Sequence, residues 1–231
     1  MSTIIHPPDA SSPARPQPPT LEAGDHLDQK TFHARYEAMP QGTQAELIGG
    51  VVYMPSPMKL PHGRLQQLVS NWLGDYEELT PGVQAVAGVT TILGEDSEPQ
   101  PDCSLYILPE RGGQIGISDD QYITGAPELI VEIASSTESY DLHSKKRDYE
   151  VSGVCEYVVV AVRQAKVFWF IRGKHKFEET MPHDDGIIRS EVFPGLWLDP
   201  KALIEMDRTR LREITRQGCA TDAHAEFVNK P

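Results

Sequence analysis

One run of aliphatic residues, ELIVEIAS at positions 128–135, constrains this 231-residue chain more than any other feature. A continuous apolar run of this length is typical of a central strand that is buried on both faces of a sheet. Two further runs, EYVVVAV (156–162) and KVFWFIR (166–172), predict strands joined by a short turn. The core is therefore expected to form on a β-sheet.

The rest of the chain alternates between helical and extended patterns. Its apolar spacings and turn residues predict the following elements in order: a helix at 28–39 with Asp28 as N-cap, a hairpin at 45–55 around Gly49-Gly50, an amphipathic helix at 62–79, strands at 83–93 and 103–108, a loop at 111–121, a short helix at 140–153, a strand near 174–180 and a helix at 200–217. This order indicates an α/β (α+β) fold, with a mixed central sheet flanked by helices.

The domain boundaries follow from composition. Six prolines lie in the first nineteen positions, so residues 1–24 are expected to form a disordered tail, with a Pro-rich docking segment as the alternative. Residues 25–200 are expected to form the folded domain, and residues 201–231 a C-terminal helix and tail. The three cysteines are widely separated, which favours ordinary reduced thiols.

The net charge and the lack of targeting signals limit the classes of function. The formal charge of −13 at pH 7 counts against strong, non-specific binding of nucleic acid, because phosphate contacts need lysine and arginine. It leaves open a local basic groove, or an acidic pocket that is offset by a bound cation. The sequence contains no apolar run that could span a bilayer and no signal peptide, so we expect a cytoplasmic protein without membrane contact.

The aliphatic run at 128–135 contains one acid, Glu132. A carboxylate in an apolar strand costs several kcal/mol unless it is paired, hydrogen-bonded or bound to a metal. A second acid, Asp102, follows Pro101 and directly precedes a predicted strand. Glu132 could instead lie at a strand end and reach solvent or an arginine, and Asp102 could be a turn residue.

A lysine follows the two acids on a predicted helix. Asp141, Lys145 and Tyr149 are spaced by four, so they line one face of that helix. The alternative is an exposed ion pair worth roughly 0.2–0.5 kcal/mol. Two carboxylates and a lysine are typical of sites that hydrolyse phosphodiesters, because carboxylate oxygens suit Mg²⁺ and an ammonium stabilises developing negative charge.

Short motifs in a fixed order carry a family resemblance: AELIGGVVYMPSP (45–57), PD (101–102), PELIVEIASS (127–136), D-x-x-x-K-x-x-x-Y (141–149), GVCEYVVV (153–160) and FPGLWLD (193–199). Over about residues 30–200 the chain resembles the Uma-type family of putative restriction endonucleases, in the PD-(D/E)xK nuclease superfamily. The resemblance implies a restriction endonuclease-like core and Mg²⁺ as cofactor, with Mn²⁺ as a substitute.

The resemblance also assigns roles to residues. It implies that Asp102 and Glu132 bind the metal and that Lys145 is the catalytic lysine, with Glu46 as a candidate outer acid. The superfamily's usual lysine position is Ala134 here, so a lysine from the following helix takes its place; Lys146 is the second candidate because it is adjacent.

Two more polar residues are accessory candidates. His62 opens the predicted helix and is placed to contact phosphate or a metal-bound water, unless it only caps the helix. Gln100 is placed to bind near the site through its amide. The three tryptophans are predicted to pack in the core or at its edge: Trp72, Trp169 and Trp197.

Three functions are compatible with these residues. The first is a Mg²⁺-dependent DNA endonuclease, which as an enzyme cutting both strands is expected to be a homodimer. The second is a nuclease-fold protein whose role is binding or assembly, which the acidic charge and the displaced lysine favour. The third is a phosphoesterase that acts on a small molecule with the same carboxylates.

Overall fold

The computed structural model describes residues 18–135, 137–174 and 176–230. It is built on a mixed six-stranded sheet, in the order β11 (Phe177–Thr180), β10 (Lys166–Arg172), β9 (Glu156–Ala161), β8 (Leu129–Ala134), β5 (Cys103–Ile107) and β3 (Val83–Ala87). β8 and β9 pair in parallel and every other pair in this sheet is antiparallel. The predicted α/β (α+β) fold with a mixed central sheet is confirmed.

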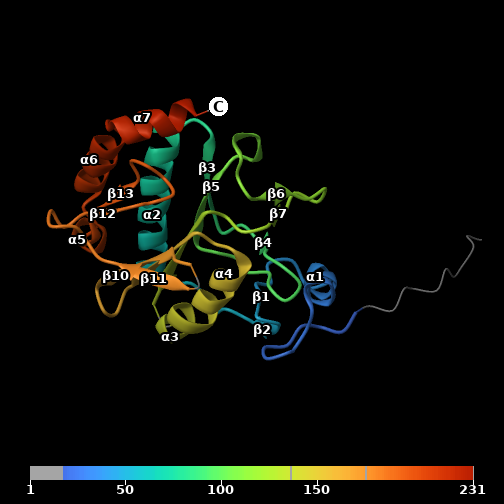
Figure 1. Cartoon of the computed structure of the whole chain (residues 1–231). Helices are drawn as coiled ribbons and strands as arrows, with labels where there is room; N and C mark the ends of the chain where they lie inside the picture. Colours follow the sequence, from blue (N-terminus) through green and yellow to red (C-terminus); the bar gives the residue numbers. More distant parts are fainter. Residues whose placement is uncertain (1–17, 136, 175, 231) are drawn as a thin grey trace, which may run out of the picture.

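The central position of β8 explains its aliphatic sequence. All six residues of β8 are buried, because helices cover both faces of the sheet. Leu129, Val131 and Ile133 pack in the same core as α2 (Leu60–Leu79). Beside α2 lie α5 (Pro200–Ile204), α6 (Arg208–Cys219) and α7 (Asp222–Asn229) (Figure 1). Successive side chains of a strand point to opposite faces, so Glu132 lies on the other face.

That second face is covered by a continuous helical segment. It consists of α3 (Glu138–Tyr140), a π-helical turn η2 (Asp141–Lys145) and α4 (Lys146–Ser152), as expected for the helix at 140–153. Gly153, with φ of 106°, ends the segment in the left-handed conformation that favours glycine. Ile130 and Ala134 of β8 pack here against Tyr149.

The N-terminal part of the chain forms a third layer at the right of Figure 1. Asp28 caps α1 (Gln29–Glu37), and β1 (Glu46–Ile48) and β2 (Val51–Tyr53) form the expected hairpin. Gly49 and Gly50 both have positive φ, which explains the glycine pair at the turn. Residues 1–17 of the expected tail lie outside the described residues. Among the described residues of that stretch, Leu21 is buried and Gly24 N donates to Val52 O, and the boundary at 24 stays a prediction.

Two stretches differ from the sequence prediction. The expected strand at 83–93 is divided into β3 and β4 (Thr91–Ile92) by Gly88, whose φ is +64°. β4 joins a second sheet in the order β4, β7 (Ile123–Thr124), β6 (Gly116–Ile117). The expected loop at 111–121 therefore contains a short strand, which sequence periodicity does not reveal because two residues are too few for a pattern.

The C-terminal region contains more helix than expected. β12 (Ile188–Arg189) and β13 (Trp197–Leu198) form a two-stranded sheet, which is followed by three helices: α5 (Pro200–Ile204), α6 (Arg208–Cys219) and α7 (Asp222–Asn229). Asp199, Asp207 and Thr221 cap these helices in turn. The single helix and tail expected at 201–231 are thus replaced by capped helices that pack on α2.

Two of the three tryptophans lie in the core. Trp72 and Trp169 are fully buried, with their ring centres 6.0 Å apart in an edge-to-face arrangement. Trp197 on β13 is partly buried, and its backbone carbonyl accepts a hydrogen bond from Trp72 Nε1 at 3.0 Å. In the part of the chain that the structure describes, no helix is both long enough and apolar enough to cross a membrane.

Candidate active site

Lys145 is the centre of a buried ion-pair cluster. Its Nζ atom donates to Oε1 of Glu132 at 2.9 Å and to Oε1 of Glu46 at 3.0 Å. The three side chains are only 6%, 5% and 9% exposed, respectively. Three elements that are distant in the sequence supply them: η2, β8 and β1. A buried carboxylate must be paired, and the partner of Glu132 is this lysine.

Tyr149 completes the donors around Glu132. Its hydroxyl donates to the same Oε1 atom at 2.7 Å, and its ring is fully buried against Tyr157. Lys145 and Tyr149 are four residues apart on one helical face, as the sequence spacing predicted. Lys145 is the last residue of the π-helical turn η2, from which its side chain reaches Glu132 on β8. Such turns are frequent at functional sites.

Asp102 lies beside Glu132 at the end of β5. Its Oδ2 atom accepts a hydrogen bond from the backbone N–H of Ile133 at 2.7 Å, and its Oδ1 atom lies 2.9 Å from Nε2 of His62. In the antiparallel register of β5 and β8, Cys103 pairs with Val131. The next pair outward is Asp102 with Glu132, and opposed side chains of an antiparallel pair share a face. The two predicted acids are therefore brought together.

The electrostatics of the cluster are dominated by excess negative charge. Burial disfavours the charge of Lys145, but the carboxylates of Glu132, Glu46 and Asp141 together raise its pKa, so it stays protonated. Burial raises the pKa of Glu132 well above its usual range against the opposing effect of Lys145, and Asp102 adds to the increase. Burial likewise raises the pKa of Asp141 to about 6.

The carboxylate of Asp102 also affects the protonation of His62. Its hydrogen bond to Asp102 raises its pKa, although burial acts in the opposite direction. Gln66, one turn further along α2, donates to the backbone carbonyl of Asp102 at 3.0 Å. Both α2 residues thus hold Asp102 in place, His62 through the Asp102 side chain and Gln66 through the Asp102 backbone carbonyl.

The oxygen atoms of the cluster suit a hard cation. Oε2 of Glu132 and Oε2 of Glu46 make no hydrogen bond within the described residues. Among the described residues, only Oη of Tyr140 is a fully buried side-chain polar atom without a partner. The two Oε2 atoms also lack a partner but are not in that class, so both are exposed to solvent. Across residues 18–135, 137–174 and 176–230, no three His, Cys, Asp or Glu side chains form a metal-binding group. Mg²⁺ commonly binds one or two carboxylates and keeps several waters, which Asp102 and Glu132 fit.

The structure separates the two candidate lysines. Lys145 reaches the acids, whereas Nζ of Lys146 lies 3.7 Å from the centre of the Phe170 ring. Adjacent helical residues point about 100° apart, so only one of them can face Glu132. Ala134, two residues after Glu132, is buried on the same face of β8 as Glu132.

The accessory candidates also lie at the site. Glu46 and His62 contact Lys145 and Asp102, as described above. Gln100 contacts Glu46 through its backbone N–H, at 2.8 Å from Oε1. Its side-chain amide donates instead to the carbonyl of Gly88 at 3.0 Å, so the expected contact through the amide is made by the main chain.

Two aromatic residues at the site were not among the sequence candidates. The rings of Tyr53 and Tyr140 lie 4.3 Å apart, and Nζ of Lys145 is 5.6 Å from the centre of the Tyr140 ring. Tyr53 belongs to the β1–β2 hairpin, which also carries Glu46. Tyr140 adjoins Asp141 in the D-x-x-x-K-x-x-x-Y motif, and that proximity is the only signal the sequence offered.

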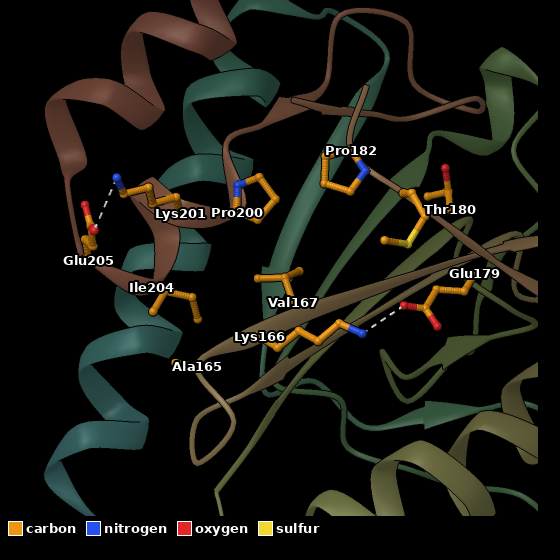
Figure 2. A pocket seen from close by; sticks show the side chains of 11 residues that line it. Ala165, Lys166, Val167, Glu179, Thr180, Pro182, Pro200, Lys201, Ile204 and Glu205 are labelled. Atoms are coloured by element: carbon orange, nitrogen blue, oxygen red, sulfur yellow. Dashed lines mark hydrogen bonds and ion pairs between the residues drawn. The ribbon is translucent and has the colours of Figure 1, made fainter. Parts of the chain in front are cut away.

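A separate pocket lies away from these residues. It has a volume of about 340 Å³ and lies between β10, β11 and α5, with Val167, Pro182 and Ile204 among its apolar lining (Figure 2). The ion pair of Lys166 with Glu179, at 3.2 Å, lies along one side. None of the acids or lysines of the candidate site lines it.

Comparison with known proteins gives one family and one fold. A family model described as "Uma2: Putative restriction endonuclease" matches residues 31–201. Comparison with curated proteins finds no match. A crystal structure of a putative nuclease belonging to DUF820 from Anabaena variabilis ATCC 29413 superposes with a TM-score of 0.57 at 17% identity. The superposition covers 74% of this chain and 97% of that one, and it shows a common fold.

Proposed function

Because the chain belongs to the Uma2 family of putative restriction endonucleases, we propose that it is a Mg²⁺-dependent endonuclease that hydrolyses phosphodiester bonds in DNA. One observation carries the proposal: Lys145 binds Glu132 in a buried cluster whose next acid along the sheet is Asp102. A buried ammonium between carboxylates is costly to maintain for stability alone, because apolar side chains of similar volume are often at least as stable.

Asp102 and Glu132 are the residues that would hold the ion, since their oxygens are hard ligands on one face of the sheet. When bound, Mg²⁺ supplies Lewis-acid polarisation of the phosphate and lowers the pKa of water. The hydrogen bond from Ile133 N fixes one oxygen of Asp102 in place. This fixed geometry is what a preorganised site requires.

The chain's own groups supply the remaining electrostatics. Lys145 keeps its proton, so its ammonium stabilises negative charge that develops on the phosphate oxygens. His62 is a proton carrier at the rim of the site, because its ring contacts Asp102 and remains 19% exposed. Tyr149 and Lys145 together hold the carboxylate of Glu132 in one orientation.

Plasmid nicking tests the proposal. Wild-type protein with Mg²⁺ should convert supercoiled plasmid to the nicked form, and EDTA should stop the reaction. Asp102→Asn and Glu132→Gln should each abolish nicking, whereas Glu110→Gln, which changes an exposed acid away from the site, should not. Calorimetric titration with Mn²⁺ should show binding to wild type and to Glu110→Gln only. Nicking that persists in both site variants would refute the assignment.

A second function is favoured by a specific observation. Lys145 already donates to two carboxylates, and the whole chain carries a formal charge of −13. A nuclease-fold protein whose role is binding or assembly would show both features. It would give no metal-dependent cleavage of any nucleic acid, and sedimentation analysis would reveal a stable complex with a partner chain. Sedimentation of the protein alone also tests the homodimer that we propose for cleavage of both strands.

A further inference from the structure

Among the residues that the structure describes, the hydroxyl of Tyr140 has no hydrogen-bond partner. Among the described residues, its Oη atom is the single fully buried side-chain nitrogen or oxygen in this condition. A buried hydroxyl without a partner costs about 1–3 kcal/mol. Such an atom in a folded protein calls for a specific reason, such as a catalytic role or a group that binds there.

The surroundings of Tyr140 make the missing partner conspicuous. Burial raises the pKa of Tyr140, and the charges of Glu46, Glu132 and Asp141 raise it further. The phenol therefore stays protonated and remains a hydrogen-bond donor. Three carboxylates lie near enough to affect it, yet it donates to none of them; Lys145 and Tyr149 serve Glu132 instead.

The ring of Tyr140 also covers the ion-pair cluster. Nζ of Lys145 lies 5.6 Å from the ring centre, and the ring of Tyr53 packs on it at 4.3 Å. Both tyrosines are partly exposed, whereas Lys145 and Glu132 beneath them are 6% and 5% exposed. A phosphodiester can reach Lys145 from this side only if the ring of Tyr140 turns away from it.

We propose that Tyr140 covers the Lys145–Glu132 pair in the free protein and, when its ring turns outward, donates a hydrogen bond from Oη to a phosphate oxygen of the bound phosphodiester. This inference rests on the proposed function, because it assumes that a phosphodiester enters the site. The ring leaves its contact with Tyr53, and the hydroxyl gains an acceptor that it lacks in the free protein. The donor is needed because Glu132, Glu46 and Asp141 surround one lysine, with Asp102 beside Glu132, and these carboxylates disfavour an anion.

The variant Tyr140→Phe tests the proposal because it removes one oxygen and keeps the ring. Since Oη makes no hydrogen bond to residues 18–135, 137–174 or 176–230, the melting temperature of Tyr140→Phe should be equal to or above that of wild type. Its kcat/KM for DNA cleavage should fall about 10- to 100-fold, as expected for one hydrogen bond to a charged group. Its affinity for a DNA duplex in Ca²⁺ should fall as well.

Tyr106→Phe is the matched control. It also removes one phenolic oxygen. This hydroxyl donates to Gln84 Oε1 at 2.8 Å and contacts none of the residues of the candidate site. It should cleave and bind DNA as wild type does. The proposal is overturned if Tyr106→Phe loses as much activity as Tyr140→Phe. It is also overturned if Tyr140→Phe cleaves and binds like wild type, or melts at a lower temperature.

The duplex-binding measurement separates this inference from the proposed function. If wild type cleaves no DNA, the endonuclease assignment fails, and binding in Ca²⁺ alone decides about Tyr140. Weaker binding by Tyr140→Phe than by wild type would then support the phosphate contact. Equal binding by the two proteins, or no binding by wild type, would overturn it.

Discussion

The ammonium of Lys145 and the carboxylate of Glu132 meet 2.9 Å apart, although a helix carries the lysine and a central strand carries the acid. In the nuclease pattern that the sequence resembles, both groups lie on one strand, two residues apart. Here Ala134 leaves that strand position without an amine, and η2 supplies it from above the sheet. The same charge can thus reach the same acid from a different element.

The first prediction concerns the adjacent lysines. Lys145→Met leaves two buried carboxylates without their cation, so it should lower the free energy of unfolding by about 3–5 kcal/mol at pH 8. The loss should be smaller at pH 5, where the acids can take up protons. Lys146→Met removes only the contact with Phe170 and should cost about 1 kcal/mol or less. Urea unfolding measures both, and equal losses would contradict the buried cluster.

The second prediction compares two buried tyrosines. Tyr149→Phe removes a donor to the Glu132 carboxylate and should cost about 1.5–3 kcal/mol. Tyr157→Phe removes a hydrogen bond of 3.0 Å to the backbone carbonyl of Asp141 and should cost about 0.5–1.5 kcal/mol, because that acceptor is neutral. Thermal unfolding of the two variants ranks them. A larger loss for Tyr157→Phe would argue that Glu132 is uncharged in the folded protein.

The third prediction concerns pH and Asp148. This acid accepts hydrogen bonds from Ser97 Oγ and Gly49 N, and burial raises its pKa to about 6. Between about pH 4 and pH 6 the folded state holds a proton that the unfolded state has released. The stability from this group is therefore complete below pH 4 and is lost as the pH rises to 6, by up to about 3 kcal/mol.

Asp148→Asn tests this pH dependence, because asparagine does not titrate and can still accept from Gly49 N. Denaturant unfolding at pH 4.5 and pH 7 should show a smaller difference for Asp148→Asn than for wild type. Asp141, whose pKa is also raised to about 6, accounts for part of the slope that remains. An unchanged slope would show that Asp148 has an ordinary pKa.

The fourth prediction concerns the packing of α6. A Cβ atom added at Gly218 would lie 2.1 Å from the carbonyl oxygen of Gly195, so Gly218→Ala should destabilise the protein by about 1–3 kcal/mol. A Cβ added at Gly74 in α2 would meet nothing within 4 Å, so Gly74→Ala should stabilise the protein by about 0.5–1 kcal/mol. Melting temperatures that move in the same direction would contradict this contact between α6 and the segment before β13.

Long periodic segments were predictable from the sequence. The helix at 60–79 and the strands at 129–134, 156–161 and 166–172 have enough residues for burial to impose a clear pattern. The two-residue strands β4, β6 and β7 do not, and β4 leaves the line of β3 at Gly88 to join the second sheet. The extra C-terminal helices were missed because their stability comes from caps and from packing on α2.

At the site, the sequence by itself determined that an acid in an apolar strand needs a partner, and that Asp102, Glu132 and a lysine recur in a nuclease-like order. Only the tertiary structure decided that Lys145 rather than Lys146 is that partner. It also brought Glu46 to the same ammonium and, within the described part of the chain, left the hydroxyl of Tyr140 without an acceptor. The physical reason is that spacing along a helix sets which side chains share a face, whereas the π-helical turn and the packing of three distant elements set what that face meets.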